Sequence, residues 1–262
     1  MSRLPLDFGC GSLKLAGTLD TAPGTTGLLL VSGGNEVRSG AFSGQSQLAS
    51  RIARAGFSVF RFDRRGIGDS EGENRGFRSS EGDISAALKA FRAIAPQVER
   101  VFAFGNCDAA SALMLSRGAG CDGLILSNPW TIEDGENGAE DAIPPPAAIR
   151  ARYAEKLKNP KEIGRLLSGG VNLGKLIRGL AKSLGPAPAP STLADEMRAG
   201  LEQFSGPVRI LLASADRTAQ VFDESWDKSD PRIARCEGAG HAYVETEHRD
   251  WLEAQILAAL RS

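Results

Sequence analysis

Three side chains suited to nucleophilic catalysis each follow an apolar run of the sequence. Cys107 and Asp216 come two residues after such runs, and His241 lies in the small-residue segment "EGAGHAYVE" behind a third. A thiolate can attack an acyl carbon, an imidazole can carry the proton, and a carboxylate can orient the imidazole. These residue types, each placed after a strand-like run, predict a Cys-His-Asp catalytic triad.

Cys107 lies where an apolar strand pattern changes into a small-residue helix pattern, in "VFAFGNCDAASALML" (101–115). The local pattern G-x-C-x-A resembles the G-x-S-x-G nucleophile elbow, in which a strand turns abruptly into a helix. Gly105 and Ala109 supply the small neighbours that such a turn needs. The start of a helix also favours a thiolate over a thiol. A buried cysteine that only packs at this position is the alternative, because Cys is among the most buried residue types.

The order of the three residues, nucleophile then acid then histidine, is the order found in α/β-hydrolases. His241 is the predicted base, since it enters a small-residue loop directly after a strand. Asp216 is the predicted orienting acid, although an aspartate here could equally cap the next helix. The second histidine, His248, lies among acidic residues inside the last helical pattern, and we expect it on the exposed face of that helix.

An acyl-transfer site also needs two N–H groups that bind the oxyanion. The segment "VSGGNEVRSG" (31–40) occupies the loop that donates the first of them in this fold, which makes Gly34 or Asn35 the candidate. The residue after the nucleophile, Asp108, is the candidate for the second. A flexible glycine turn without a catalytic role is the alternative reading of the glycine pair.

A further glycine-rich stretch, "RFDRRGIGDSEG" (61–72), matches the D-x-R-G-x-G-x-S loop found beside the active site in many α/β-hydrolases. Its glycines allow a tight, irregular path. We expect Asp63, Arg65 and Ser70 to hold this loop by charge-assisted hydrogen bonds, and we interpret their role as structural.

Strand-like apolar runs alternate with helical periodicity along the chain, which predicts a mostly parallel sheet covered on both faces. The expected fold is an α/β-hydrolase fold with eight strands, in one domain over residues 1–262. Residues 130–204 interrupt the alternation with "IPPPAA" and "LGPAPAP", and we interpret them as a helical lid insertion. The expected strands are 27–32, 57–63, 101–105, 123–128, 208–214 and 232–237, with a leading hairpin at 6–19; the expected helices are 42–55, 81–95, 107–117 and 245–261.

Composition excludes several classes of function. The 262 residues carry 31 Lys and Arg against 32 Asp and Glu, so no excess of positive charge points to nucleic acid or an acidic membrane. No apolar run is long enough to insert stably in a membrane, and a small-molecule acyl substrate is the expected partner. The four scattered cysteines predict free thiols and a cytoplasmic location. No metal or nucleotide motif is present, so we expect no cofactor.

Several motifs together resemble one family more closely than the fold alone would. The segments "SGGNEVRSG", "FRFDRRGIGDSEG", "FGNCDAASALML", "LSNPW", "RYAEKLKNPKEIGRLLSG" and "ASADRTAQVF" are similar to those of the exosortase A system-associated hydrolases of the first type. That family accompanies bacterial exopolysaccharide and protein-sorting loci. The resemblance covers nearly the whole chain and implies that Cys107, Asp216 and His241 form the triad. This chain departs from the family at Asn35, where a proline is common, and at Gly240, where an aspartate is common.

A Cys-His-Asp site on this scaffold is expected to cleave an ester or a thioester through an acyl-enzyme. An acyltransferase, which passes the acyl group to a hydroxyl, is the nearest alternative. The other alternative is a catalytically idle scaffold that binds a lipid or a partner through the insertion, where "IGRLLSGGVNLGKLIRGLAKSL" (163–184) mixes aliphatic and basic residues.

Overall fold

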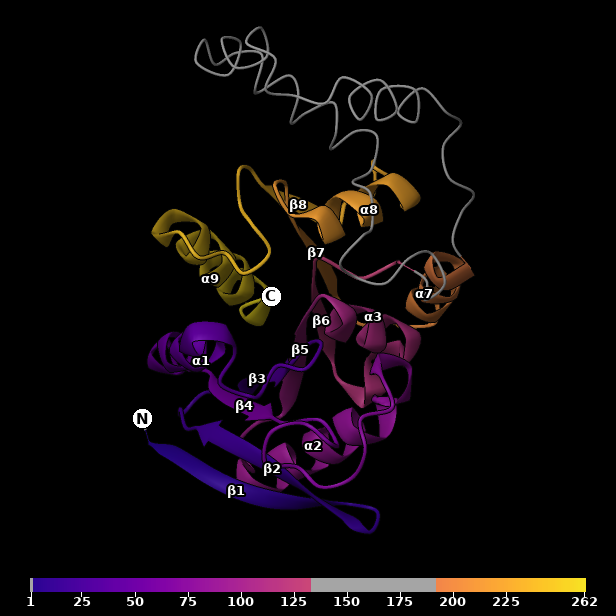
Figure 1. Cartoon of the computed structure of the whole chain (residues 1–262). Helices are drawn as coiled ribbons and strands as arrows, with labels where there is room; N and C mark the ends of the chain where they lie inside the picture. The colour runs from indigo at the N-terminus through magenta and orange to yellow at the C-terminus, as the bar shows by residue number, and fades with distance from the viewer. Residues whose placement is uncertain (1, 133–191) are drawn as a thin grey trace, which may run out of the picture. The chain divides into compact units, whose positions relative to one another are not determined.

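The structure is a computed structural model in which residues 2–132 and 192–262 are described. Its centre is an eight-stranded sheet with the strand order β1-β2-β4-β3-β5-β6-β7-β8 (Figure 1). The strands are β1 (Arg3–Cys10), β2 (Leu13–Asp20), β3 (Thr26–Val31), β4 (Ser58–Phe62), β5 (Arg100–Asn106), β6 (Gly123–Ser127), β7 (Val208–Ala213) and β8 (Ile233–Cys236).

Two pairings in the sheet are antiparallel and the others are parallel. β1 pairs with β2 in antiparallel fashion and forms the leading hairpin that the sequence predicts. β2 also pairs with β4 in antiparallel fashion. From β4 to β8 every neighbour is parallel. The prediction of a mostly parallel, eight-stranded α/β-hydrolase sheet is therefore confirmed.

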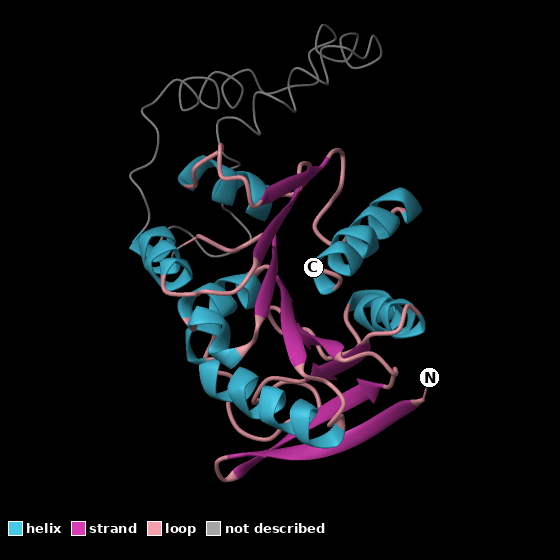
Figure 2. Ribbon diagram, turned by 180° about the vertical axis from the view of Figure 1, so that it is seen from behind, coloured by secondary structure: helices cyan, strands magenta, loops and turns pink. Residues whose placement is uncertain are grey.

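Helices cover both faces of the sheet (Figure 2). The described α-helices are α1 (Gly44–Arg54), α2 (Glu81–Ile94), α3 (Asp108–Leu115), α7 (Thr192–Glu202), α8 (Arg217–Ser225) and α9 (Thr246–Leu260). Three short 3-10 helices are η1 (Ala41–Ser43), η2 (Phe77–Ser79) and η3 (Arg117–Gly120).

Each face of the sheet has its own hydrophobic core. Side chains of a strand alternate between the faces, so Leu28 and Leu30 of β3 pack on one side while Leu29 and Val31 pack on the other. The first core also contains buried residues of α1 and α9, and the second contains buried residues of α2, α3, α7 and α8. This double burial explains why the central strands are almost continuous apolar runs.

Four parallel strands deliver the predicted site residues to one edge of the sheet. β3, β5, β7 and β8 run in the same direction, so their carboxyl ends lie at the same edge. Gly34 follows β3, Cys107 follows β5, Asp216 follows β7 and His241 follows β8. Ligands of open α/β sheets bind at this carboxyl edge.

Most of the expected insertion, residues 133–191, lies outside the described residues. Within the remainder, α7 packs against α3, and its side chains Leu193, Met197 and Leu201 join the core of the main sheet. No helix among the described residues is long and apolar enough to cross a bilayer.

The glycine-rich loop after β4 is held by a buried carboxylate, as expected. Asp63 is fully buried and accepts hydrogen bonds from the backbone and the guanidinium of Arg38 and from the backbone N–H of Asp69. Ser70 donates to the Asp63 carbonyl at 2.7 Å, and Arg65 forms an ion pair with Asp83 at 2.6 Å. Asp63 and Arg38 thus connect this loop to the loop after β3.

We expect Asp63→Asn to lower the free energy of unfolding by about 2–4 kcal/mol, because it removes the charge that neutralises a half-buried guanidinium. The matched control is Asp69→Asn. Asp69 contacts the same Arg38 guanidinium at 2.9 Å, but its side chain is 74% exposed. Its replacement should cost less than about 1 kcal/mol. Urea unfolding measures both, and equal effects would contradict the structural role of Asp63.

Candidate active site

Cys107 occupies a strained turn between β5 and α3. Its backbone has φ 61° and ψ −129°, a conformation that L-residues rarely adopt. The Cys107 N–H donates to the Ser127 carbonyl of β6 at 3.0 Å, and the Cys107 carbonyl accepts from Ala110 at 3.1 Å. The sheet and the helix therefore both hold the turn, and the cysteine remains half-buried rather than enclosed.

Glycines next to the turn leave no room for larger residues. A Cβ atom on Gly105 would lie 2.7 Å from the backbone carbon of Ala109 and 2.8 Å from the Ala110 nitrogen. A Cβ atom on Gly33, in the loop after β3, would lie 2.6 Å from the Asn106 carbonyl oxygen. These close approaches are the physical reason for the small residues that the sequence shows around Cys107.

Asp216 and His241 are brought together as the sequence predicts. The Asp216 Oδ2 and His241 Nδ1 atoms are 3.0 Å apart, and the Asp216 side chain is 9% exposed against 41% for His241. The same Oδ2 atom accepts a hydrogen bond from the Ala219 N–H at 3.1 Å, so Asp216 is also the N-cap of α8. Asp216 is therefore a helix cap and also contacts the imidazole, as the orienting acid of a triad would.

The environment of His241 favours the charged imidazolium. The hydrogen bond with Asp216 is the main cause that raises the pKa of His241 to about 10, and the interaction with the Cys107 side chain is the second. Burial acts in the opposite direction but is weaker. Cys107, His241 and Asp216 thus form one interacting set at the carboxyl edge of the sheet.

The predicted oxyanion loop is held by a carboxylate. The Gly34 N–H donates to Asp108 Oδ1 at 2.6 Å, and the second oxygen of Asp108 lies 3.3 Å from the Arg64 guanidinium. Arg64 also donates to the Gly34 carbonyl at 2.6 Å. Among the described residues, the backbone N–H groups of Asn35 and Asp108 donate to no protein acceptor. Of the two candidates for the first oxyanion donor, the Gly34 N–H is therefore already hydrogen-bonded, whereas the Asn35 N–H has no acceptor in the described part of the chain.

Two asparagines contact His241 that the sequence analysis does not identify. Asn106 Nδ2 lies 3.3 Å from His241 Nε2, and Asn128 Nδ2 donates to Asn106 Oδ1 at 3.0 Å. Both amides also reach the His241 carbonyl, at 3.3 and 3.4 Å. The available signal was their position: each is a polar residue at the carboxyl end of one of two neighbouring central strands.

The expectation that His248 is exposed is wrong. His248 is 9% exposed, and its Nδ1 atom lies 3.0 Å from Glu245 Oε2, one turn earlier. The acidic neighbours indicated a solvent-exposed helix face. Their carboxylates are indeed exposed, but they contact a ring that is itself buried. His248 contacts none of the predicted catalytic residues in the described part of the chain.

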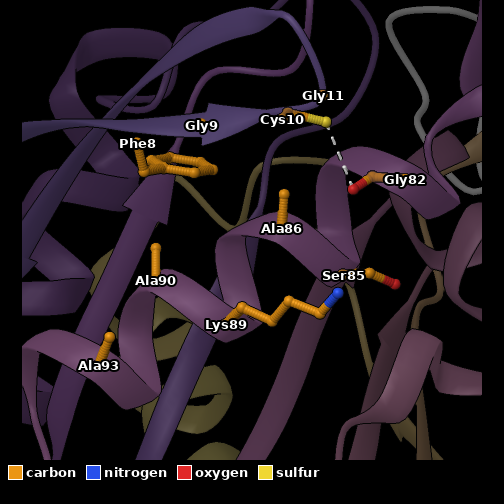
Figure 3. A pocket seen from close by; sticks show the side chains of 10 residues that line it. All are labelled: Phe8, Gly9, Cys10, Gly11, Gly82, Ser85, Ala86, Lys89, Ala90 and Ala93. Atoms are coloured by element: carbon orange, nitrogen blue, oxygen red, sulfur yellow. Dashed lines mark hydrogen bonds between the residues drawn. The ribbon is translucent and has the colours of Figure 1, made fainter.

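A groove of about 620 Å³ lies elsewhere, between the end of β1 and α2 (Figure 3). Its lining includes Phe8, Cys10 and Lys89 and none of the three predicted catalytic residues. Cys10 is held there by the Gly82 carbonyl at 3.6 Å. No group of His, Cys, Asp and Glu suited to a metal ion occurs among the described residues.

Residues 26–170 match the family described as serine aminopeptidase, S33, which is more than half of the chain. The chain belongs to the S33 family. No curated protein sequence matches it significantly. The match begins at β3 and includes Cys107, the predicted nucleophile, whereas the family name refers to serine.

Solved structures share the fold of this S33 member at low sequence identity. An esterase from Pyrococcus furiosus is 12% identical with a TM-score of 0.62, and the match covers 99% of this chain and 90% of that one. The α/β-hydrolase GrgF from Penicillium sp. sh18 is 17% identical with a TM-score of 0.65, covering 100% and 98%. Est1E from Butyrivibrio proteoclasticus, solved with ferulic acid, is 13% identical with a TM-score of 0.62, covering 98% and 100%.

The turn predicts a steric penalty at Gly105. Gly105→Ala should lower the free energy of unfolding of this S33 member by about 1–3 kcal/mol, because the new methyl group meets backbone atoms that cannot move aside. Gly9→Ala in β1 is the control, since its Cβ would meet nothing within 4 Å. That control should change stability by less than about 0.5 kcal/mol. If Gly105→Ala unfolds in urea like the control, the tight turn is not required.

The four free thiols should differ in reactivity. Burial raises the pKa of Cys121 to about 12 and also raises the pKa values of Cys10 and Cys236. Cys107, beside an imidazole, should therefore react with iodoacetamide at pH 7 at least about tenfold faster than the other three. Mass spectrometry of the peptides measures the rates, with urea-unfolded protein as the control in which the differences should vanish. Faster alkylation of the half-buried Cys10 would contradict this expectation.

Proposed function

We propose that this chain hydrolyses an ester or a thioester through an acyl-enzyme on Cys107, with His241 as the base and Asp216 as the orienting acid. The observation that carries the proposal is the backbone of Cys107, which has a positive φ at a strand-to-helix turn beside the His241–Asp216 pair. Backbone strain of this kind collects at functional sites, because a residue that only packs gains nothing from it.

In the proposed reaction, the Cys107 proton passes to His241 Nε2 and the sulfur attacks the acyl carbon. A carbon–sulfur bond forms, and the carbonyl electron pair moves to the oxygen. When the tetrahedral intermediate collapses, the bond to the leaving alkoxide or thiolate breaks, and the leaving group takes the proton from His241. A water molecule then attacks the thioester and gives a proton to His241. Release of the acid restores the Cys107 thiol.

The free N–H groups of Asn35 and Asp108 support an oxyanion site on either side of Cys107. Two backbone donors aimed at the developing negative charge provide a large part of catalysis in such reactions. Gly34, the other candidate, would become available only if its hydrogen bond to the Asp108 carboxylate broke. We therefore assign the pair to Asn35 and Asp108 in this proposal.

A cysteine nucleophile favours activated acyl groups. A thiolate is a better leaving group than an amine, so the intermediate formed from a peptide tends to expel sulfur unless His241 protonates the amine first. Esters and thioesters have leaving groups that need less assistance. This is why we propose ester or thioester cleavage although the family name refers to an aminopeptidase.

The sequence motifs support a more specific cellular role for the chain. Their resemblance to the exosortase A system-associated hydrolases supports a role beside exopolysaccharide and protein-sorting functions. The free state of the described cysteines supports a reducing, cytoplasmic location. We also propose that the chain is a single catalytic domain in which the insertion acts as a lid, except for α7, whose buried side chains belong to the core of the main sheet. Transfer of the acyl group to a hydroxyl acceptor uses the same intermediate.

The proposal predicts that hydrolysis of p-nitrophenyl acetate and of a short acyl thioester depends on Cys107. Cys107→Ala should lower kcat/KM by about 10³-fold or more, because no covalent intermediate can form. Cys10→Ala removes another incompletely buried thiol and should leave the rate unchanged. Intact-protein mass spectrometry should detect an acyl adduct in the wild type and none in Cys107→Ala.

Other outcomes would assign the chain differently. Turnover that survives in Cys107→Ala would refute the nucleophile. Turnover of an aminoacyl p-nitroanilide but of neither ester would assign a peptidase, and an adduct released only when an alcohol is added would assign an acyltransferase. A wild type that forms no adduct with any of these donors would be an idle scaffold.

A further inference from the structure

The orientation of the Asn106 amide is fixed by a backbone group. The Ala213 N–H, which can only donate, gives a hydrogen bond to Asn128 Oδ1 at 2.9 Å. Asn128 must therefore present its NH₂ group to Asn106, and it does so at 3.0 Å from Asn106 Oδ1. Asn106 in turn presents its own NH₂ group to His241 Nε2 at 3.3 Å. Reversing either amide would oppose two donors.

These hydrogen bonds form an amide relay that runs from the Ala213 N–H through Asn128 and Asn106 to His241. The relay indicates which ring nitrogen of the neutral His241 carries the proton. A nitrogen that faces an N–H donor must offer its lone pair, so Nε2 is the acceptor. The other nitrogen, Nδ1, faces a carboxylate oxygen of Asp216 at 3.0 Å and must be the donor. Of the two neutral tautomers, both of these contacts therefore favour the one with the proton on Nδ1.

We propose that Asn106 is a positioning residue that favours this neutral tautomer of His241 and thereby opposes the charge separation between the imidazole and the Cys107 sulfur. The proposal rests on the proposed role of Cys107 as the nucleophile. Nε2 then exchanges the Asn106 N–H for the Cys107 proton when the acyl group arrives.

The relay opposes the charges around the ring. Among the described residues, the titratable groups that act on His241 are Asp216, before α8, and Cys107, after β5, and both favour the imidazolium. A hydrogen bond donated to the neutral ring favours the neutral form instead. Asn106 is the donor that supplies this counterweight, and Asn128, behind it, is uncharged.

The same amides also hold the histidine loop in place. The His241 carbonyl accepts from Asn106 at 3.3 Å and from Asn128 at 3.4 Å, and Tyr243 contacts Ser127 Oγ through its hydroxyl at 3.1 Å. Loss of Asn106 could therefore lower activity by loosening the loop alone. The test must use a quantity that loosening would not shift, which is the pH at which Cys107 ionises.

The first test is the pH profile of Cys107 alkylation by iodoacetamide. Asn106→Leu conserves volume and removes the N–H that faces Nε2, so the imidazolium becomes easier to form. The midpoint of the profile should fall by about one pH unit, which is a tenfold higher thiolate fraction below the midpoint. Gln97→Leu, which removes an amide bound only to the exposed Ala22 carbonyl, should leave the profile unchanged.

The second test observes the ring directly by ¹⁵N NMR. The chain has two histidines, so a His248→Gln variant assigns the His241 signals. In a pH titration the wild-type ring should lose its Nε2 proton and keep its Nδ1 proton. Asn106→Asp, which places an acceptor opposite Nε2, should keep both nitrogens protonated to a pH about one unit higher than the wild type.

These measurements need no turnover, so they separate the two proposals. A wild-type ring that loses its Nδ1 proton instead of its Nε2 proton would overturn the role of Asn106, and so would an unshifted alkylation midpoint in Asn106→Leu. If Asn106→Leu does not fold, the wild-type spectrum and Asn106→Asp decide the question. Failure of Cys107 to form an acyl adduct would refute the proposed function while leaving the ring measurements valid.

Discussion

The abrupt change from strand to helix at Cys107 is the constraint on which the rest of the candidate site depends. A positive φ lifts the cysteine out of the strand direction, and the turn is possible only because Gly105 and Gly33 allow backbones to approach closely. Because the turn ends β5 in the middle of the sheet, the strands on either side fix where other loops can reach it. The proposed acid, Asp216, follows β7, the proposed base, His241, follows β8, and the proposed oxyanion loop follows β3.

Charge around this turn is balanced by pairs rather than by solvent. Asp108, directly after the cysteine, is neutralised by Arg64 and holds the Gly34 N–H. Asp216 is nearly covered and shares its charge between a helix end and an imidazole. The candidate site therefore consists of four loops: Asp108 joins the loops after β3 and β5, and Asp216 joins the loops after β7 and β8.

The strands, the covering helices and the meeting of Asp216 with His241 could be predicted from the sequence, because each depends on apolar periodicity and chain order. The buried position of His248 could not be predicted. Acidic neighbours in the sequence indicate an exposed side chain, whether they surround the ring or contact it from one side only. Asn106 and Asn128 were missed for a different reason. An asparagine has no distinctive chemistry until its orientation is known, and that orientation depends on the Ala213 N–H far along the chain.

The shared oxygen of Asp216 links the first turn of α8 to the state of the imidazole. Oδ2 accepts from both the Ala219 N–H and the His241 ring, and an acceptor that is drawn towards a positive ring binds its other donor less strongly. A helix that starts on such an oxygen frays more when the ring is charged. Amide hydrogen exchange at Ala219 should therefore depend on the charge of His241, a side chain that belongs to a different loop.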